Sequence, residues 1–179
     1  MATLTCPMPE NINPLSANGF MFNISKLPEV SFFCQQVNLP NITLGVADQA
    51  TPFSMIPIPG EMLTYGTLDL QFLIDENMNN FKSVYNWMTG LGFPVNNKQY
   101  SDLVSSSNIN QRNELMSNYS DAVLQILNSN NNSSETKTIQ FRDIFPVSLE
   151  SLTMMSTSTD VQYLVGSVSF RISYYEFMA

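Results

Sequence analysis

The sequence predicts a mainly β protein: an antiparallel β-sandwich or barrel with one packed α-helix. Three features of the 179-residue chain lead to this prediction. Apolar and polar residues alternate over three segments, which is typical of strands with one face in the core and one in solvent. A clear helical repeat of apolar residues lies over residues 79–92. The length and the lack of an internal repeat fit a single domain over residues 1–179.

The clearest alternation lies over residues 20–25, 66–75 and 168–174, and we expect each segment to be a strand. Weaker alternation predicts strands at 121–128 and 136–141. We expect the apolar members of the clear segments in the core: Phe20, Phe22, Ile24, Leu68, Leu70, Phe72, Ile74, Val168, Phe170, Ile172 and Tyr174.

Residues 30–37 carry apolar side chains on both sides of an extended chain, among them Val30, Phe32 and Phe33. This pattern predicts a strand that is covered on two sides or that joins a subunit interface. Cys34 within this segment is expected to be a small buried hydrophobe.

Residues 79–92 are expected to form the packed helix, and the apolar repeat consists of Phe81, Val84, Tyr85, Met88 and Leu91. Asp75 and Glu76 precede this helix. The positive end of the helix dipole favours carboxylates at such positions. We expect Trp87 in the core, with a role as an interface anchor as the alternative. A second short helix is predicted at 99–106.

Residues 39–63 contain several prolines and are expected to form an extended, interrupted loop. The segment is unusually apolar for a surface loop, so we expect another subunit to cover it. The candidate inter-subunit residues in and near it are Phe33, Val37, Ile42, Leu44, Phe53, Met55, Ile56 and Ile58. Residues 96–118 are rich in Asn and Ser and are expected to be an exposed insertion.

Composition argues against several classes of function. The chain has no histidine, so catalysis and metal binding by histidine are excluded. Its net charge is −8 and its seven Lys and Arg residues are scattered, which disfavours a nucleic-acid-binding protein. The sequence contains no phosphate-binding glycine motif, no nucleophile motif and no apolar run long enough to span a membrane. We therefore expect no catalytic residues, no metal site and no cofactor.

The order of several segments carries a resemblance. These segments are 20–25, 30–35, Leu39-Pro40, 66–74, Asp75-Glu76 before the helix with Trp87, and the aromatic C-terminal stretch 168–176. In this order the chain resembles the tail tube proteins of contractile-tailed, T4-like bacteriophages and related proteins of the tail tube and baseplate tube family. The resemblance covers the chain apart from residues 96–118.

The resemblance implies a structural virion protein that forms hexameric rings, which stack into a tube for DNA ejection. It implies contacts with further copies of the chain and with tail sheath, baseplate and neck or terminator proteins, while DNA passes without specific binding. The protein would then lie in the virion tail after assembly in the host cytoplasm. Two alternatives remain: a tube initiator, baseplate or terminator component with the same fold, and a sugar-binding β-sandwich. An enzyme is disfavoured by the lack of histidine.

In a ring of this kind, one sheet face points to the core and the other to the channel, because side chains alternate. The residues that the pattern leaves for the channel are Thr67, Asp69, Gln71, Ser167, Ser169 and Arg171. Such a lining is polar, small and nearly neutral to acidic, and Arg171 is expected to pair with a neighbouring carboxylate such as Asp69. The alternative is that this face meets outside solvent.

Overall fold

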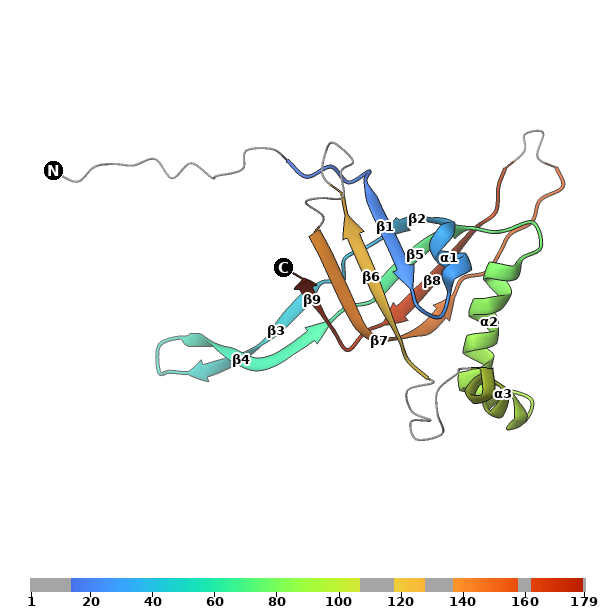
Figure 1. Ribbon diagram of the computed structural model, residues 1–179. Coiled ribbons are helices and arrows are strands. Elements are labelled where there is room, and N and C mark those ends of the chain that lie inside the picture. Colours follow the sequence, from blue (N-terminus) through green and yellow to red (C-terminus); the bar gives the residue numbers. More distant parts are fainter. Residues whose placement is uncertain (1–13, 107–117, 128–136, 158–161, 179) are drawn as a thin grey trace.

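The computed structural model describes residues 14–106, 118–127, 137–157 and 162–178. Seven strands form one sheet in the order β1-β6-β7-β8-β5-β2, with β9 paired to β7, and a separate two-stranded sheet joins β3 to β4 (Figure 1). In chain order the elements are β1 (Phe20–Ile24), α1 (Pro28–Phe32), β2 (Cys34–Val37), β3 (Ile42–Ala50), β4 (Met55–Tyr65), β5 (Leu68–Leu73), α2 (Asn79–Gly92), α3 (Lys98–Ser106), β6 (Ser120–Ile126), β7 (Lys137–Leu149), β8 (Val165–Arg171) and β9 (Tyr174–Met178).

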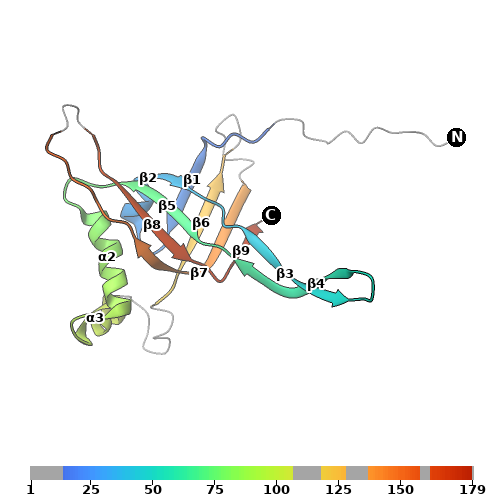
Figure 2. The same ribbon diagram turned by 180° about the vertical axis from the view of Figure 1, so that it is seen from behind.

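Strand β7 belongs to two layers. Its first half pairs with β6 and β9, whereas its second half, from Phe145 to Leu149, pairs with β8. Asp143 lies between the two halves with a φ of 54°, a left-handed conformation that Asp tolerates better than most residues. The layers β1-β6-β7-β9 and β7-β8-β5-β2 overlap in both views, with β1 and β6 nearer in Figure 1 and β8 and β5 nearer in Figure 2. The fold is therefore an antiparallel sandwich with one shared strand, which confirms the predicted class.

The core lies between these layers and contains the residues that strand alternation predicts. Phe22 and Phe141 meet edge to face across it, with ring centroids 6.4 Å apart. Among the residues expected in the core, the buried ones are Phe22, Ile24, Leu68, Leu70, Phe72, Val168, Phe170 and Ile172. The placement of Tyr174 in the core is wrong: β8 ends at Arg171, the chain turns, and Tyr174 begins β9 with an exposed side chain.

Helix α2 has the predicted bounds and covers the sandwich on the side remote from the β3–β4 hairpin (Figures 1 and 2). Trp87 is 4% exposed, and its ring lies 6.1 Å from that of Phe170. The expected core position of Trp87 is thus confirmed. The predicted apolar face is partly wrong, because Tyr85 is 54% exposed while the buried face contains Asn80, Val84 and Trp87.

The start of α2 depends on a buried amide rather than on the preceding acids. The N-cap residue is Met78, and no side chain caps it, so the preceding acids Asp75 and Glu76 make no capping hydrogen bond to the helix. Asn80 donates from Nδ2 to the Leu73 carbonyl at 2.7 Å. Its Oδ1 accepts the Phe81 N–H at 2.8 Å and the Asp75 N–H at 3.3 Å. This side chain joins the end of β5 to the first turn of the helix.

The prediction of a strand over residues 30–37 is wrong for its first half, because Pro28–Phe32 is the short helix α1. Pro28 favours the first turn of a helix, and Val30 is buried on its inner side. Only Cys34–Val37 forms strand β2. The apolar residues on both sides of this segment therefore belong in part to a helical turn and not to a strand covered on two sides. Phe32, at the end of this turn, is 83% exposed.

The prediction of a loop over residues 39–63 is also wrong, because β3 and β4 form a hairpin there. Pro57 and Pro59 lie inside β4, opposite Asp48 and Val46. A strand tolerates proline when its missing N–H would face the sheet edge. The hairpin has two outer edges, so these prolines do not break it.

The weaker predictions mostly hold. Strand β6 matches the segment predicted at 121–128, and β7 includes 137–141 but continues to Leu149. Helix α3 confirms the second helix predicted at 99–106. It forms part of the region expected as an insertion at 96–118, of which residues 107–117 lie outside the described residues.

We predict that Asn80→Ala destabilises the protein by about 3 kcal/mol, because it leaves buried N–H and C=O groups without partners. For a chain of this size the midpoint of thermal unfolding should fall by roughly 6–12 °C. Asn79→Ala is the matched control, since Asn79 is exposed in the same helical turn and should change the midpoint little. Equal midpoints for the two variants in a calorimetric scan would contradict this role of Asn80.

Candidate assembly surfaces

The layer β2-β5-β8 has a polar outer face. Its register places Asp69 opposite Ser169 and Gln71 opposite Ser167, on the side away from the buried Leu68, Leu70 and Phe72. We call the set predicted for the channel the polar face: Thr67, Asp69, Gln71 and Arg171 are exposed, and Ser167 and Ser169 are half-buried. Strand alternation thus placed all six on one side of the sheet, outside the core.

Asp69 is the centre of a hydrogen-bond network on the polar face. Its carboxylate accepts the Ser169 hydroxyl at 2.6 Å and the Asn38 amide at 3.0 Å. Its backbone N–H donates to Asn38 Oδ1 at 2.6 Å. These bonds join β5 to β8 and to the residue that follows β2. The network fixes the direction of the carboxylate.

The expected pair between Arg171 and Asp69 does not form within the chain. Asp69 is bound by Asn38 and Ser169 instead. The ion pairs of the described residues lie on the other layer, where Arg142 contacts Asp121 at 3.0 Å and Glu176 at 3.6 Å. The polar face therefore presents one acidic and one basic side chain that are not paired with each other.

The β3–β4 hairpin projects from the sandwich as an arm (Figures 1 and 2). Apolar side chains are exposed on both faces of this arm. Met55 and Ile56 are adjacent in β4, so they point to opposite faces, and both are exposed. Phe53, in the turn between the strands, is 98% exposed. Six predicted interface residues lie on this arm and are all exposed: Ile42, Leu44, Phe53, Met55, Ile56 and Ile58.

The other two predicted interface residues are not exposed on the arm. Phe33 and Val37 are half-buried and pack against the core of their own chain. Val46, Met62 and Leu63 are not among the predicted interface residues, but they too are exposed on the hairpin. The alternation of β3 and β4 would have assigned these three residues to the arm, but the prolines suggested a loop.

The root of the arm is attached to the sandwich. The rings of Tyr65 and Tyr175 meet edge to face with centroids 5.5 Å apart, and the Tyr175 hydroxyl donates to the Pro40 carbonyl at 3.4 Å. Farther out, Gly60 allows the two strands to approach closely. A Cβ atom at this position would lie 2.6 Å from the Gly45 carbonyl oxygen. The arm is thus a well-formed hairpin that is attached to the sandwich at its root and does not pack into the core.

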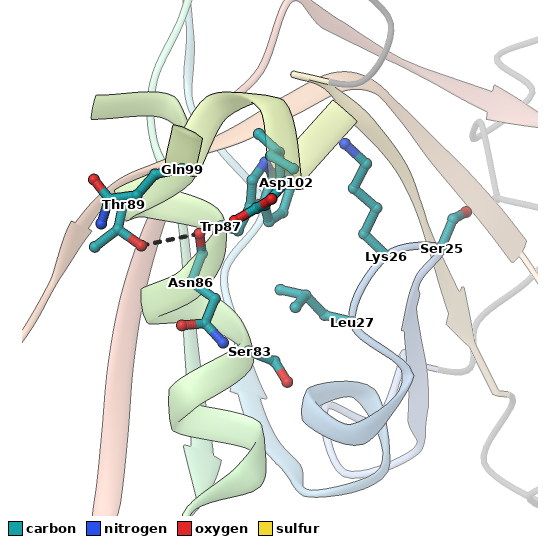
Figure 3. Close-up of a pocket in the computed structure, with 10 residues that line it drawn as sticks. Ser25, Lys26, Leu27, Ser83, Asn86, Trp87, Thr89, Gln99 and Asp102 are labelled. Carbon is teal, nitrogen blue, oxygen red and sulfur yellow. Dashed lines mark hydrogen bonds between the residues drawn. The ribbon is translucent and has the colours of Figure 1, made fainter. Parts of the chain in front are cut away.

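A groove of about 720 Å³ lies beside α2 and α3 (Figure 3). Lys26 Nζ lies 5.0 Å from the centre of the Trp87 ring, and burial lowers the pKa of this lysine to about 8. The described residues that line the groove offer hydroxyl and amide groups and one carboxylate, that of Asp102. Because Trp87 is almost fully buried, its ring is not available to stack on a sugar. The groove therefore lends no support to the sugar-binding alternative.

The described residues contain no group of three or more His, Cys, Asp or Glu that could hold a metal ion. Cys34 is half-buried, and burial raises the pKa of its thiol to about 11, so it stays protonated at neutral pH. No helix in the described ranges has the length and hydropathy of a membrane span.

Comparisons with known proteins point to one family. The family model of the phage tail tube proteins matches residues 4–178. No curated protein sequence matches the chain. Among solved structures, the chain is similar to the tube-terminating cap of the anti-feeding prophage, with a TM-score of 0.62 and 14% identity over 99% of both chains.

Two chains from PVC, an extracellular contractile injection system, are also similar. One comes from its sheath-tube complex in the extended state, with a TM-score of 0.56 and 15% identity over 93% of this chain and 92% of that chain. The other comes from its sheath/tube terminator, with the same TM-score and 17% identity over 93% and 98%. At these identities the likeness is one of fold. Since the family model spans nearly the whole sequence and the sandwich agrees with these structures, the chain belongs to the phage tail tube protein family.

Proposed function

We propose that the protein assembles into hexameric rings that stack into the tail tube, the conduit for DNA ejection. The observation that carries this proposal is the β3–β4 arm, which exposes apolar side chains on both faces. Soluble monomers rarely expose apolar patches beyond roughly 300–600 Å². A neighbouring copy in the same ring or the next ring would cover the arm.

The unpaired strand edges support the same proposal. In the described part of the chain, β1 and β2 lie at the two ends of the strand order, and each has a neighbour on one side alone. Free edges are a hazard in a monomer, and a closed ring removes them when strands of adjacent subunits pair. A ring is therefore a natural state for this sandwich.

The polar face is suited to line the channel. Thr67, Gln71, Ser167 and Ser169 are uncharged, and Asp69 is held in place by its hydrogen bonds. A strongly basic lining would release counterions and bind phosphate, which would slow the passage of DNA. A lining with one carboxylate and one guanidinium per subunit avoids such binding, in line with the net charge of −8.

The partners follow from the assemblies in which the similar chains occur. Those chains come from a sheath-tube complex, a sheath/tube terminator and a baseplate. We propose corresponding contacts of this protein with tail sheath, baseplate and neck or terminator proteins. Its place is then the tail of the particle, after assembly in the host cytoplasm.

A second candidate is a component that ends the tube. The cap of the anti-feeding prophage has a TM-score of 0.62, against 0.56 for the chain of the PVC sheath-tube complex. The copy number per particle separates the two functions, because a tube subunit repeats along the tail and a terminating ring occurs once. Quantitative mass spectrometry of purified particles measures this number.

We predict that Phe53→Asp combined with Ile56→Asp abolishes assembly and leaves the sandwich folded. Both side chains lie on the arm outside the core, and burial of unpaired carboxylates at an interface is strongly unfavourable. Val95→Asp is the control, since it places a carboxylate at an exposed apolar position on the side of α2 and α3. Sedimentation velocity and negative-stain microscopy report rings or tubes, and circular dichroism reports the fold. Tubes formed by the double variant would rule out the arm as an assembly surface.

We predict that Asp69→Lys combined with Gln71→Lys slows genome ejection, most strongly at low salt, because each new cation adds a phosphate contact. Tubes should still assemble, since both side chains lie outside the core. Glu76→Lys with Asn77→Lys changes the charge equally on an exposed segment before α2 and is the matched control. Wild-type ejection kinetics in low salt for the first pair would show that the polar face does not line the path of DNA.

A further inference from the structure

The two outer edges of the β3–β4 hairpin differ in their capacity to accept another strand. Within the described residues, β3 pairs with β4 alone, so each strand has one free edge. In an antiparallel pair, residues opposite each other alternate between those that exchange hydrogen bonds and those whose N–H and C=O groups point outward. The register therefore determines which groups each edge presents.

The turn of the hairpin sets this alternation. The Thr51 N–H donates to the Ser54 carbonyl at 3.0 Å, which makes these two residues a hydrogen-bonded pair. Counting from there, the pairs whose backbone groups point outward are Ala50–Met55, Asp48–Pro57 and Val46–Pro59. Both prolines occupy outward positions, in agreement with their lack of an N–H group.

In the outer half of the arm, the edge of β4 is consequently closed at two of three outward positions, whereas the edge of β3 is open at all three. Of the outward positions of β4 in the outer half of the arm, Pro57 and Pro59 lack a donor and only Met55 retains one. Across the hairpin, Ala50, Asp48 and Val46 all keep their N–H and C=O groups, and every residue of β3 is exposed. Proline on one edge is a known means to prevent pairing there.

We propose that the open edge of β3 pairs with an edge strand of a second copy of this chain, β1 or β2, and that the prolines of β4 restrict this contact to one side of the arm. The inference rests on the proposed assembly into a tube and names the backbone contact that builds it. A contact between β3 and a different strand is heterologous, so it continues from subunit to subunit and can close a ring.

Strands β1 and β2 provide edges of the sandwich with which β3 of a second copy could pair. Strands β1 and β2 lie at the ends of the strand order and contain neither a charged residue nor a proline. Natural edge strands that remain unpaired usually carry such residues as protection. The outward positions of β3 include one charge, that of Asp48, so no like charges oppose the pairing. A second copy of the chain therefore fits the edge of β3 without a repulsive element.

The test compares Asp48→Pro with Asp48→Ala in the full chain. Asp48→Pro removes an outward N–H and leaves the bonds inside the hairpin, whereas Asp48→Ala removes the charge and keeps the N–H. We expect loss of rings and tubes in sedimentation velocity and microscopy for Asp48→Pro, and wild-type assembly for Asp48→Ala. Val46→Pro, at the next outward position, should act like Asp48→Pro. Circular dichroism verifies that each variant is folded.

Hydrogen exchange of the assembled wild-type chain is the second measurement. The amides of Val46 and Asp48 should gain protection on assembly together with those of β1 or β2. Assembly of both proline variants at wild-type levels, or β3 amides that stay unprotected, would overturn the inference and leave the proposed tube intact. Dimers that pair β3 with β3 would overturn it as well. A wild-type chain that stays monomeric and fails to join tubes would instead contradict the proposed function itself.

Discussion

The bend of β7 at Asp143 is the constraint on which the rest of the structure depends. The first half of β7 is hydrogen-bonded to β6 and β9, and the second half is hydrogen-bonded to β8. The change of direction brings the alternating apolar residues of both layers face to face. The Asp143 N–H donates to the Asp121 carboxylate at 3.3 Å, and Arg142 binds the same carboxylate at 3.0 Å. The Asp121 carboxylate therefore binds two consecutive residues at the bend, on the side away from the core.

Because the core closes within the sandwich, the apolar residues of β3 and β4 have no place in it. Tyr65 and Tyr175 attach the root of the arm, and beyond this contact the hairpin leaves the molecule. The apolar side chains of the hairpin therefore do not stabilise the core, unlike those of the core strands. In β1, β5 and β8 alternation separates a buried face from a polar one, whereas in the arm both faces are apolar and exposed. This difference separates residues that stabilise the subunit from residues available to join subunits.

The charges are divided between the two layers in a way that fits this arrangement. Arg142, Asp121 and Glu176 form ion pairs on the layer with β6 and β9. On the other layer Asp69 is bound by neutral partners, and Arg171 is not paired with it. The polar face is therefore ordered by hydrogen bonds rather than by strong charge. An ordered and weakly charged surface of this kind is compatible with the proposed role of the polar face as a channel lining.

The sequence alone determined the features that depend on local periodicity. These are the antiparallel β class, the strands with Phe22, Leu70 and Phe170 in the core, the bounds of α2, and the side of the sheet on which Asp69 lies. They were predictable because alternation with a period of two or a helical repeat records which face of an element is buried. The apolar content of residues 39–63, rather than any periodicity, led to the expectation that this segment needs cover.

Only the tertiary structure decided features that depend on partners distant in the sequence. Pro57 and Pro59 suggested a loop, but the pairing of β4 with β3 places them at positions that need no N–H. Val30 and Phe32 suggested a strand, but the burial of Val30 on the inner side of α1 selects a helical turn. The Asn80 bonds to the end of β5 and the bend of β7 at Asp143 also have no local signature. In each case the deciding free energy comes from a contact between distant segments, which the order of residues does not record.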